Sequence, residues 1–278
     1  MCPAPGRGFF VSMAGVDIVR AATLGVVQGL TEFLPVSSSG HLVLANRFLF
    51  GGEALPLWVD IASNTGTFLA ALFLMRHEIK SALGAFFAGL FSKEARRSPG
   101  WRLFWLVVVA SLPAAVVGLL IKDHFELVNR PFFVALGLLF TALVLWTTPP
   151  GGDKDAPEKV SFKDALLGGL AQALAIWPGV SRSGTTISAY LRLGLSPEFA
   201  ARLSFLMYAA ASFGVLLLGL KDGLPPGVEP APVLAMVAAA FASGYAAMLL
   251  LFGVLRAGKF RLFAPYVALL AVFTLLFA

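Results

Sequence analysis

Apolar residues dominate six windows of the chain, and polar residues gather in the segments between them. A helix needs about 20 mainly apolar residues to cross the hydrocarbon core of a bilayer. The six windows approach or reach this length and predict an all-α, polytopic membrane protein with six transmembrane helices. They are Trp58–Met75, Trp101–Ile121, Phe132–Thr147, Ala200–Leu220, Val233–Leu255 and Leu262–Ala278.

Composition supports the membrane class and excludes others. Hydrophobic residues make up 58% of the 278 positions and charged residues 13%, about half the charged fraction of a soluble globular chain. The net charge of +6 comes from Lys and Arg in a few loops. Basic patches interleaved with aromatics are missing from the sequence, so no nucleic-acid partner is expected. The single cysteine, Cys2, excludes an intramolecular disulfide and a Cys-based metal cluster.

Loop charges predict the side of the membrane on which each loop lies. His77–Arg102 and Arg256–Arg261 are rich in cations, and the positive-inside rule places such loops in the cytoplasm. In Lys122–Arg130 and Lys221–Pro230 acidic residues balance or outnumber the cations, so these loops should face outside. Residues 149–161 form a Pro- and Gly-containing linker that should be cytoplasmic.

This sorting leaves two segments that cannot span the membrane. Residues 162–195 must enter from the cytoplasm and return there, and residues 18–50 must enter from the outer face and return. Each half then consists of one re-entrant helix–loop–helix segment followed by three spans. Because three is an odd number, the second half is inverted relative to the first, an architecture that forms sites at the repeat interface.

The expected organisation is a single integral membrane domain over residues 1–278. Residues 1–12 lack the apolar core of a signal peptide, and with Met13 as a natural start they form a dispensable extension. The rest divides into a first inverted repeat (13–148), the linker (149–161) and a second inverted repeat (162–278).

Polar groups interrupt both expected re-entrant segments. Gln28 and Gly40 are 12 residues apart, and so are Gln172 and Gly184; each interval contains a Pro and ends in Ser-x-Ser-Gly. Polar side chains and non-helical backbone at membrane depth are costly unless they are buried in protein or line a wet cavity. The two interruptions therefore predict a functional site.

Glu32 lies inside an apolar helix, where a carboxylate usually marks an ion site, a proton relay or a substrate contact. Gln28 precedes it by four residues and shares its helix face. Together their oxygens suit a hard divalent cation such as Mg²⁺ or Ca²⁺. The alternative is a buried Glu bonded to a neighbouring helix. Asp60 and Asn64, one turn apart, are candidates for a polar rim of the cavity.

The serine-rich run that follows Pro35 suits an anion. Hydroxyl residues and Gly40 in a helix break can expose consecutive N–H groups, the concave arrangement that binds phosphate, and a following helix would add its dipole. The alternative is an ordinary helix cap. His41 favours function, because it can act as acid or base beside a hydroxyl nucleophile.

Arg182 lies in the second interruption, between two serines. Its guanidinium is the side chain best shaped to hold a phosphate through two parallel hydrogen bonds. The alternative is an internal salt bridge, with Glu32 as a candidate partner. Thr185 and Thr186 are expected to cap the outgoing helix.

At these residues the chain resembles the BacA/UppP family, the undecaprenyl-pyrophosphate phosphatases of bacterial envelopes. Gln28–His41 looks like the family's (E/Q)xxxE segment with its Ser-rich extension, and Pro178–Gly184 looks like its PGxSRSG segment. The resemblance covers residues 13–278. It implies hydrolysis of undecaprenyl pyrophosphate to the monophosphate plus phosphate, which recycles the cell-wall lipid carrier and gives bacitracin tolerance. It also implies six spans and two re-entrant helix pairs in inverted repeats.

The resemblance implies roles for the polar residues as well. Glu32 and Gln28 would handle the metal, Ser38 or His41 would serve the attack, and Arg182 would grip the pyrophosphate. The choice between Ser38 and His41 stays open, and Gln28 is a weaker metal ligand than the Glu that can stand at its position. The residues expected to bind substrate are Ser37, Ser39, Gly40, Ser181, Ser183, Gly184 and Thr186.

The expected partners are a polyprenyl pyrophosphate lipid and the bilayer, and a homodimer is a possible assembly. The expected location is the bacterial inner membrane, with a site open to the outer face because Glu32 and His41 lie in the segment that enters from outside. A rival of another class is a transporter or lipid flippase, since inverted repeats with broken helices are typical of transporters. The Ser38/His41 pair beside Glu32 favours the enzyme, because binding alone requires no nucleophile.

Overall fold

The computed structural model describes residues 16–51, 57–121, 131–219 and 228–277. Within these ranges every regular element is a helix, apart from one isolated bridge between Lys154 and Leu195. The extension 1–12, the loop Lys122–Arg130 and most of the loop Lys221–Pro230 lie outside the described residues, so the expectations for them stay predictions.

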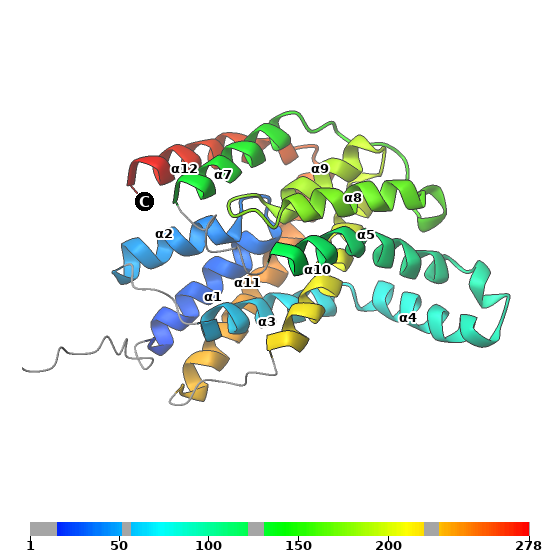
Figure 1. Ribbon diagram of the computed structural model, residues 1–278, viewed down its shortest axis with the longest axis horizontal. Helices are drawn as coiled ribbons and strands as arrows, with labels where there is room; N and C mark the ends of the chain where they lie inside the picture. Colours follow the sequence, from blue (N-terminus) through cyan, green and yellow to red (C-terminus); the bar gives the residue numbers. More distant parts are fainter. Residues whose placement is uncertain (1–15, 52–56, 122–130, 220–227, 278) are drawn as a thin grey trace, which may run out of the picture.

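Both halves of the chain contain a similar succession of helices (Figure 1). Each expected apolar window coincides with one helix, which confirms the all-α class. The first half contains α1 (Ile18–Phe33), α2 (Ser38–Phe50), α3 (Leu57–Leu74), α4 (Arg76–Phe91), α5 (Pro99–Ile121) and α7 (Pro131–Trp146). The second half contains α8 (Phe162–Leu174), α9 (Arg182–Arg192), α10 (Pro197–Gly219), α11 (Pro230–Arg256) and α12 (Phe263–Phe277).

In the described parts of the chain, four helical stretches are long and apolar enough to cross a membrane: α5, α10, α11 and the run Phe260–Phe277. Helices α3 and α4 pass the same test only as a pair, which is bent by 76°. Helix α7 is apolar but has only 16 residues, fewer than the roughly 20 of a typical span. The structure thus confirms a polytopic membrane protein, and its described residues contain four candidate spans, or five if the bent pair counts as one.

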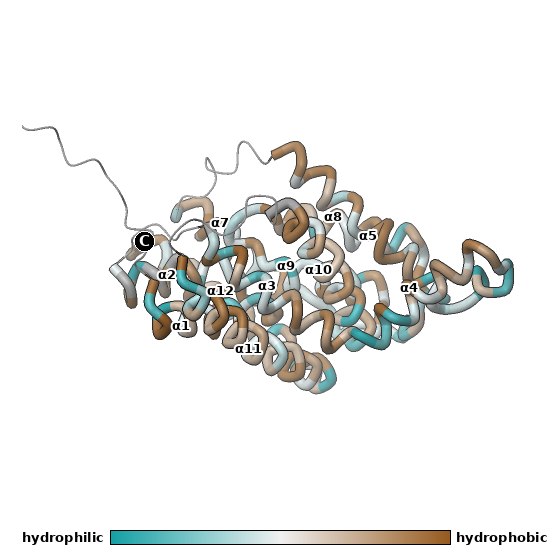
Figure 2. The backbone as a smooth tube through the Cα atoms, turned by 90° about the horizontal axis from the view of Figure 1, so that it is seen from below, coloured by the Kyte–Doolittle hydropathy of each residue, from teal (hydrophilic) through white to brown (hydrophobic). Residues whose placement is uncertain are grey.

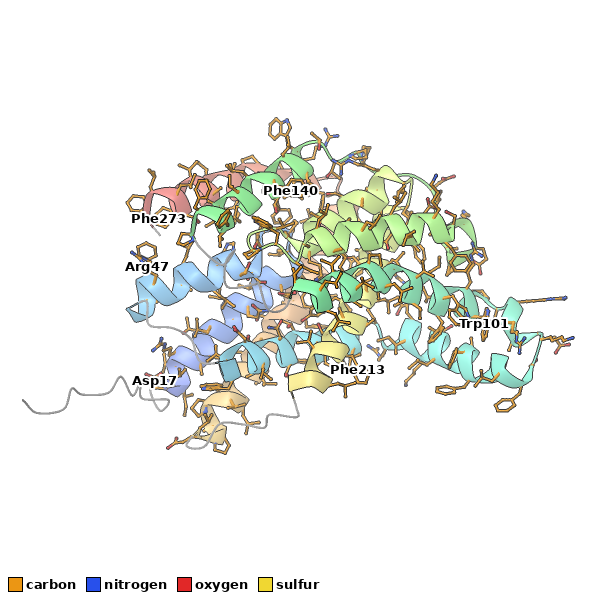
Figure 3. The ribbon with its side chains drawn as sticks, viewed as in Figure 1. Asp17, Arg47, Trp101, Phe140, Phe213 and Phe273 are labelled. Atoms are coloured by element: carbon orange, nitrogen blue, oxygen red, sulfur yellow. The ribbon has the colours of Figure 1, made fainter. Side chains whose placement is uncertain are left out.

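Apolar side chains cover the outside of the helix bundle. Figure 2 shows many hydrophobic residues along the helices, and Figure 3 shows Phe140, Phe213 and Phe273 at the periphery. These three phenylalanines are 40–53% exposed. A soluble protein rarely exposes large contiguous apolar patches, whereas a lipid-facing surface has to be apolar.

The breaks in the two helix pairs follow from local sequence. Helix α1 ends at Phe33 because Leu34 precedes Pro35, and the residue before a proline is driven out of helical conformation. The second break, between α8 and α9, contains Pro178 and Gly179, and Gly179 has a φ of +85° that favours glycine. Both breaks lie where the polar interruptions predict them.

The helices pack in pairs that join the two halves. Helix α1 packs mainly against α11, and its counterpart α8 packs against α5. Helix α3 packs against α11 and α10, and α7 lies beside α12 (Figure 1). Each pair contains one helix from each half, so the core is formed between the halves.

The linker is held in place by both halves. Lys154 donates its backbone N–H to the Gly194 carbonyl (3.1 Å) and accepts one from Ser196 (3.0 Å). The Arg102 guanidinium of α5 donates to the carbonyls of Pro157 and Val160. These bonds therefore anchor the linker to both halves, at the end of the bundle where α8 begins.

Candidate active site

The two helix breaks meet inside the bundle. The Gly179 N–H lies 3.4 Å from the Ser39 hydroxyl oxygen, and the Ser183 hydroxyl donates to the Leu34 carbonyl over 3.1 Å. In Figure 1 the pair α1–α2 and the pair α8–α9 approach this point from opposite ends of the molecule. The polar interruptions, about 150 residues apart in the chain, thus form one site.

Glu32 is the centre of this site. Its Oε1 accepts a hydrogen bond from Arg182 Nη2 (2.7 Å), and its Oε2 accepts from Ser38 Oγ (2.7 Å) and Gln28 Nε2 (3.0 Å). The side chains of Arg182 and Glu32 are only 15% and 11% exposed. A buried carboxylate is tolerated only when it is paired and its lone pairs are satisfied, and this carboxylate of α1 binds residues of three helices, α1, α2 and α9.

Arg182 is held from two directions. Its guanidinium carbon lies 4.1 Å from the centre of the Tyr208 ring, a cation–π contact. The Tyr208 hydroxyl in turn bonds Thr67 (2.6 Å), and Phe33 packs edge-on against the ring. Arg182 also forms the salt bridge to Glu32 that the sequence analysis gave as an alternative to phosphate binding. Nevertheless, Nη1 of Arg182 is buried without a hydrogen-bond partner, so the side chain keeps unused donors.

The first break has a conformation suited to anions. Ser37 has a φ of 68° and is the one non-glycine residue with a positive φ in the described parts of the chain. A left-handed residue next to a helical one turns successive N–H groups to the same side, and such strain is typical of functional sites. Ser38 begins α2 and Arg182 begins α9. Two helix N-termini, each with a partial positive charge, therefore converge at the site.

His41 is bound away from Ser38. Its Nδ1 lies 2.8 Å from the Ser37 carbonyl and its Nε2 lies 2.6 Å from the Tyr266 hydroxyl, with the two rings stacked. A carbonyl only accepts, so in the neutral imidazole Nδ1 carries the proton and Nε2 accepts from Tyr266. The expected pairing of Ser38 with His41 is thus not a hydrogen bond in this structure, where Ser38 bonds Glu32 instead.

The second break is organised by Ser181. This residue is the N-cap of α9, and its hydroxyl accepts from the Gly184 N–H over 3.1 Å. The hydroxyls of Thr185 and Thr186 donate to the carbonyls of Ser181 and Arg182, one turn back. The expectation that the two threonines cap the helix was therefore wrong, because a cap precedes the first turn.

The expected substrate-binding residues differ in how far they are already engaged. Ser37 and Ser39 bond each other (3.2 Å) beside the first break, next to Gly40 in the first turn of α2. In the first turns of α9 the Ser183 hydroxyl donates to the Leu34 carbonyl, and Thr186 is fully buried with a 2.7 Å bond to Ser204. Contact of these residues with substrate stays a prediction.

The expected metal ligands lie together with Asn64. Gln28 Nε2 faces Glu32 and also Asn64 Oδ1 (3.3 Å), while Gln28 Oε1 is buried without a partner. Among the described residues, no three His, Cys, Asp or Glu side chains gather into a metal site. The carboxylate and the two amides carry oxygens of the kind that Mg²⁺ or Ca²⁺ prefers, but Gln28 turns its nitrogen toward the other two side chains. Asp60 contacts Asn64 through its backbone carbonyl, which accepts a hydrogen bond from Asn64 Nδ2 (2.8 Å).

Sequence reasoning missed Tyr208 and Tyr266. A signal for Tyr208 exists: Ser204 and Tyr208 are four residues apart in apolar α10 and place two hydroxyls on one helix face. No comparable local signal marks Tyr266.

Comparisons with known proteins show the family to which the chain belongs. The family described as "Bacitracin resistance protein BacA" matches residues 21–273, a range that includes both breaks. Proteins named undecaprenyl-diphosphatase are similar over nearly the whole chain. One from Acaryochloris marina is 51% identical, covering 94% of this chain and 98% of that protein. One from Desulfosudis oleivorans is 39% identical and one from Methanosphaera stadtmanae 35%, each with the same coverage. The chain therefore belongs to the BacA family of bacitracin resistance proteins.

Proposed function

We propose that this chain is an undecaprenyl-diphosphatase, which hydrolyses undecaprenyl pyrophosphate to the monophosphate and inorganic phosphate. The observation that carries the proposal is Glu32 bonded to both Arg182 and Ser38 where the two breaks meet. These bonds support the proposal, in which Arg182 binds phosphate, the Ser38 hydroxyl is the nucleophile and Glu32 is the base. The product returns the lipid carrier to cell-wall synthesis, and removal of the pyrophosphate gives tolerance of bacitracin.

Arg182 binds the terminal phosphate. Its Nη1 donors are unused in the free protein, and the planar guanidinium suits two parallel bonds to phosphate oxygens. A phosphate anion also competes with Glu32 for Nη2. The helix N-termini of α2 and α9 add favourable potential for the charge that develops during phosphoryl transfer.

Ser38 makes the attack with Glu32 as base. Its hydroxyl already donates to Glu32 Oε2 over 2.7 Å, the geometry that a general base requires. The Ser38 Oγ–phosphorus bond forms as the bridging oxygen leaves with undecaprenyl monophosphate, and the serine proton passes through Glu32 to that leaving group. Water then cleaves the phosphoserine, which releases phosphate and restores the Ser38 hydroxyl. His41 positions the break, because both of its ring nitrogens are engaged elsewhere.

A divalent cation, Mg²⁺ or Ca²⁺, binds at Glu32 and Gln28 in this proposal. The unpartnered Gln28 Oε1 supports it, because a buried amide oxygen without a donor suits a cation. When bound, such a cation neutralises pyrophosphate charge. Glu32 and Gln28 would hold the cation beside Arg182.

The membrane arrangement comprises six spans and two re-entrant pairs in inverted repeats of residues 13–148 and 162–278. When each helix is replaced by its counterpart in the other half, the packed pair α1–α11 becomes α8–α5, and the pairs α3–α10 and α7–α12 stay the same. This symmetry of the packing supports the repeat. Four of the six spans are the long apolar helices. The short helix α7 and the bent pair α3–α4 provide the other two, which a criterion of helix length alone does not count. The site opens to the outer face of the inner membrane, and a homodimer is a further proposal for its assembly.

Phosphate release from undecaprenyl pyrophosphate by the purified protein in detergent tests the activity. Glu32→Gln and Arg182→Gln should each lower turnover by at least about 10²-fold, the usual loss for one electrostatic or acid–base group. Arg202→Gln is the matched control, because Arg202 forms a comparable 2.7 Å pair with Glu78 elsewhere. Wild-type protein that binds the lipid and leaves it intact would reject the phosphatase in favour of the flippase.

A further inference from the structure

Two arginines meet at the end of α7. Arg192, the last residue of α9, donates through Nη2 to the Val144 carbonyl (3.0 Å) and to the Thr147 hydroxyl (2.6 Å). Arg261, between α11 and α12, donates through Nε to the Thr148 carbonyl. Because Thr147 and Thr148 are neighbours, the two arginine side chains lie together, close enough for their positive charges to repel each other.

This cluster holds more positive charge than the end of a helix needs. The last carbonyls of a helix lack intrahelical partners, and the helix dipole there equals about half a negative charge. Two arginines at this point therefore leave roughly 1.5 positive charges unbalanced. Among the described residues, no carboxylate lies within ion-pair distance of Arg192 or Arg261, whereas Arg256, at the same end of the bundle, pairs with Glu198.

The two guanidinium groups also keep unused hydrogen-bond donors. Within the described parts of the chain, Arg261 donates only through Nε, so both of its terminal nitrogens remain available. Arg192 donates through Nη1 and Nη2 and leaves its Nε unused. Guanidinium nitrogens are well placed to bind phosphate oxygens through parallel hydrogen bonds. An anion with a phosphate group would therefore complete the cluster.

The neighbouring side chains indicate that this anion lies at the membrane surface. Trp146, the last residue of α7, is 64% exposed, and Leu262, next to Arg261, is 68% exposed. Tryptophan is enriched where the hydrocarbon core meets the lipid headgroups, so the arginines lie at the level of lipid phosphates. In the predicted orientation this end of the bundle faces the cytoplasm, where the leaflet is rich in anionic lipids.

We infer that Arg192 and Arg261 bind the phosphate of an anionic glycerophospholipid, such as phosphatidylglycerol, at the end of α7. The inference does not rest on the proposed phosphatase activity. A lipid suits both parts of this surface, because its phosphate neutralises the cluster and its acyl chains cover Trp146 and Leu262. A free phosphate ion would meet only the first requirement.

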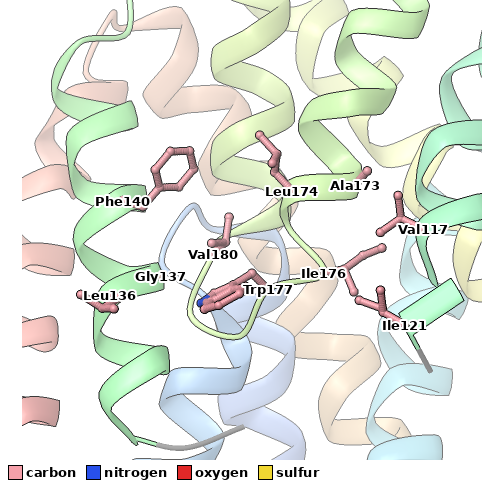
Figure 4. A pocket seen from close by; sticks show the side chains of 10 residues that line it. All are labelled: Val117, Ile121, Leu136, Gly137, Phe140, Ala173, Leu174, Ile176, Trp177 and Val180. Carbon is pink, nitrogen blue, oxygen red and sulfur yellow. The ribbon is translucent and has the colours of Figure 1, made fainter. Parts of the chain in front are cut away.

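The place of the cluster gives such a lipid a structural role. Helix α7 supports the second break: a Cβ atom at Gly137 would lie 2.2 Å from the Pro178 carbonyl oxygen, so the helix packs directly on the break. Figure 4 shows Gly137 of α7 beside Val180 of the break. Thr141, on the same helix, accepts a hydrogen bond from the Ser181 N–H (2.9 Å). A lipid that holds the end of α7 should therefore stabilise the folded protein.

Thermal unfolding of the purified, delipidated protein in an uncharged detergent tests the site. Phosphatidylglycerol should raise Tm by about 2–5 °C, whereas phosphatidylcholine and inorganic phosphate should leave it unchanged. The double variant Arg192→Gln/Arg261→Gln should lose this shift, because each arginine near a membrane surface contributes roughly five-fold to the affinity for anionic lipid. Arg256→Gln is the matched control, since Arg256 lies at the same end of the bundle but pairs with Glu198.

Four results of this experiment would overturn the inference. They are the absence of a shift in the wild-type protein, its retention in the double variant, its loss in Arg256→Gln, and an equal shift with phosphatidylcholine or inorganic phosphate.

Photolabelling of the wild-type protein provides a readout that does not depend on a folded variant. The probe is a phosphatidylglycerol with a diazirine in its glycerol headgroup. Label should fall on peptides that contain residues 144–148, 188–192 or 259–262, and excess unlabelled phosphatidylglycerol should suppress it. Label spread evenly over other helices, or equal suppression by phosphatidylcholine, would contradict a specific site.

Discussion

The Ser38 hydroxyl lies 2.7 Å from Glu32 Oε2, although a helix break separates the two residues. The break brings the first residue of α2 back beside the last turn of α1. Glu32 therefore contacts Ser38, the proposed nucleophile, within its own segment and Arg182 from the other half of the chain.

Ser38→Ala should abolish phosphate release, with a loss of at least about 10²-fold, because the attacking oxygen is removed. Acid quenching during turnover of substrate labelled on the terminal phosphate should leave the label on the Ser38 peptide of the wild-type protein. Label on a His41 peptide would assign the attack to the histidine.

Tyr266→Phe should have a smaller effect, about five-fold on kcat, since it removes one hydrogen bond worth about 1 kcal/mol. The His41 ring would keep its bond to the Ser37 carbonyl. Steady-state kinetics on purified protein would measure this, with Tyr245→Phe as a control hydroxyl deletion. A loss as large as that of Ser38→Ala would contradict a positioning role for His41.

Arg182→Lys should lower kcat/KM by roughly 10-fold or more, because lysine keeps the charge but loses the planar fork and the stacking on Tyr208. Arg202→Lys serves as the control for a general effect of the exchange. Full activity of Arg182→Lys would show that only the charge matters.

Disruption of the buried ion pair should lower stability. Arg182→Gln leaves Glu32 without its cation, and removal of one partner of a buried pair typically costs about 3–5 kcal/mol. The double variant Glu32→Gln/Arg182→Gln should regain part of the loss, because no buried charge remains unpaired. Thermal unfolding in detergent measures both, and a double variant less stable than Arg182→Gln would be the contrary result.

Chelation should abolish phosphate release, and added Mg²⁺ or Ca²⁺ should restore it. Gln28→Glu should lower the half-saturating cation concentration by about ten-fold, because a second carboxylate strengthens a site for hard cations. Titration of the chelated protein with either cation gives this value. An unchanged midpoint would place the cation away from Gln28.

Much of the fold follows from local pattern. The six apolar windows, the helix end before Pro35 and the break at Pro178 were all predicted from residues close together in the chain. The number of spans was harder to predict, because α7 has only 16 residues and the chain bends at Met75, between α3 and α4. Hydropathy describes how apolar a segment is and leaves open where the backbone bends.

The site likewise combines features that the sequence predicted with contacts that only the structure shows. By itself the sequence determined the membrane class, the two breaks and the main polar residues, because hydropathy, proline and charge act over a few residues. Only the tertiary structure decided that Ser38 bonds Glu32 while His41 bonds Tyr266, 225 residues away. It alone placed Tyr208 under Arg182. The physical reason is that these contacts depend on which helices pack together, and the packing of distant segments has no local signature in the chain.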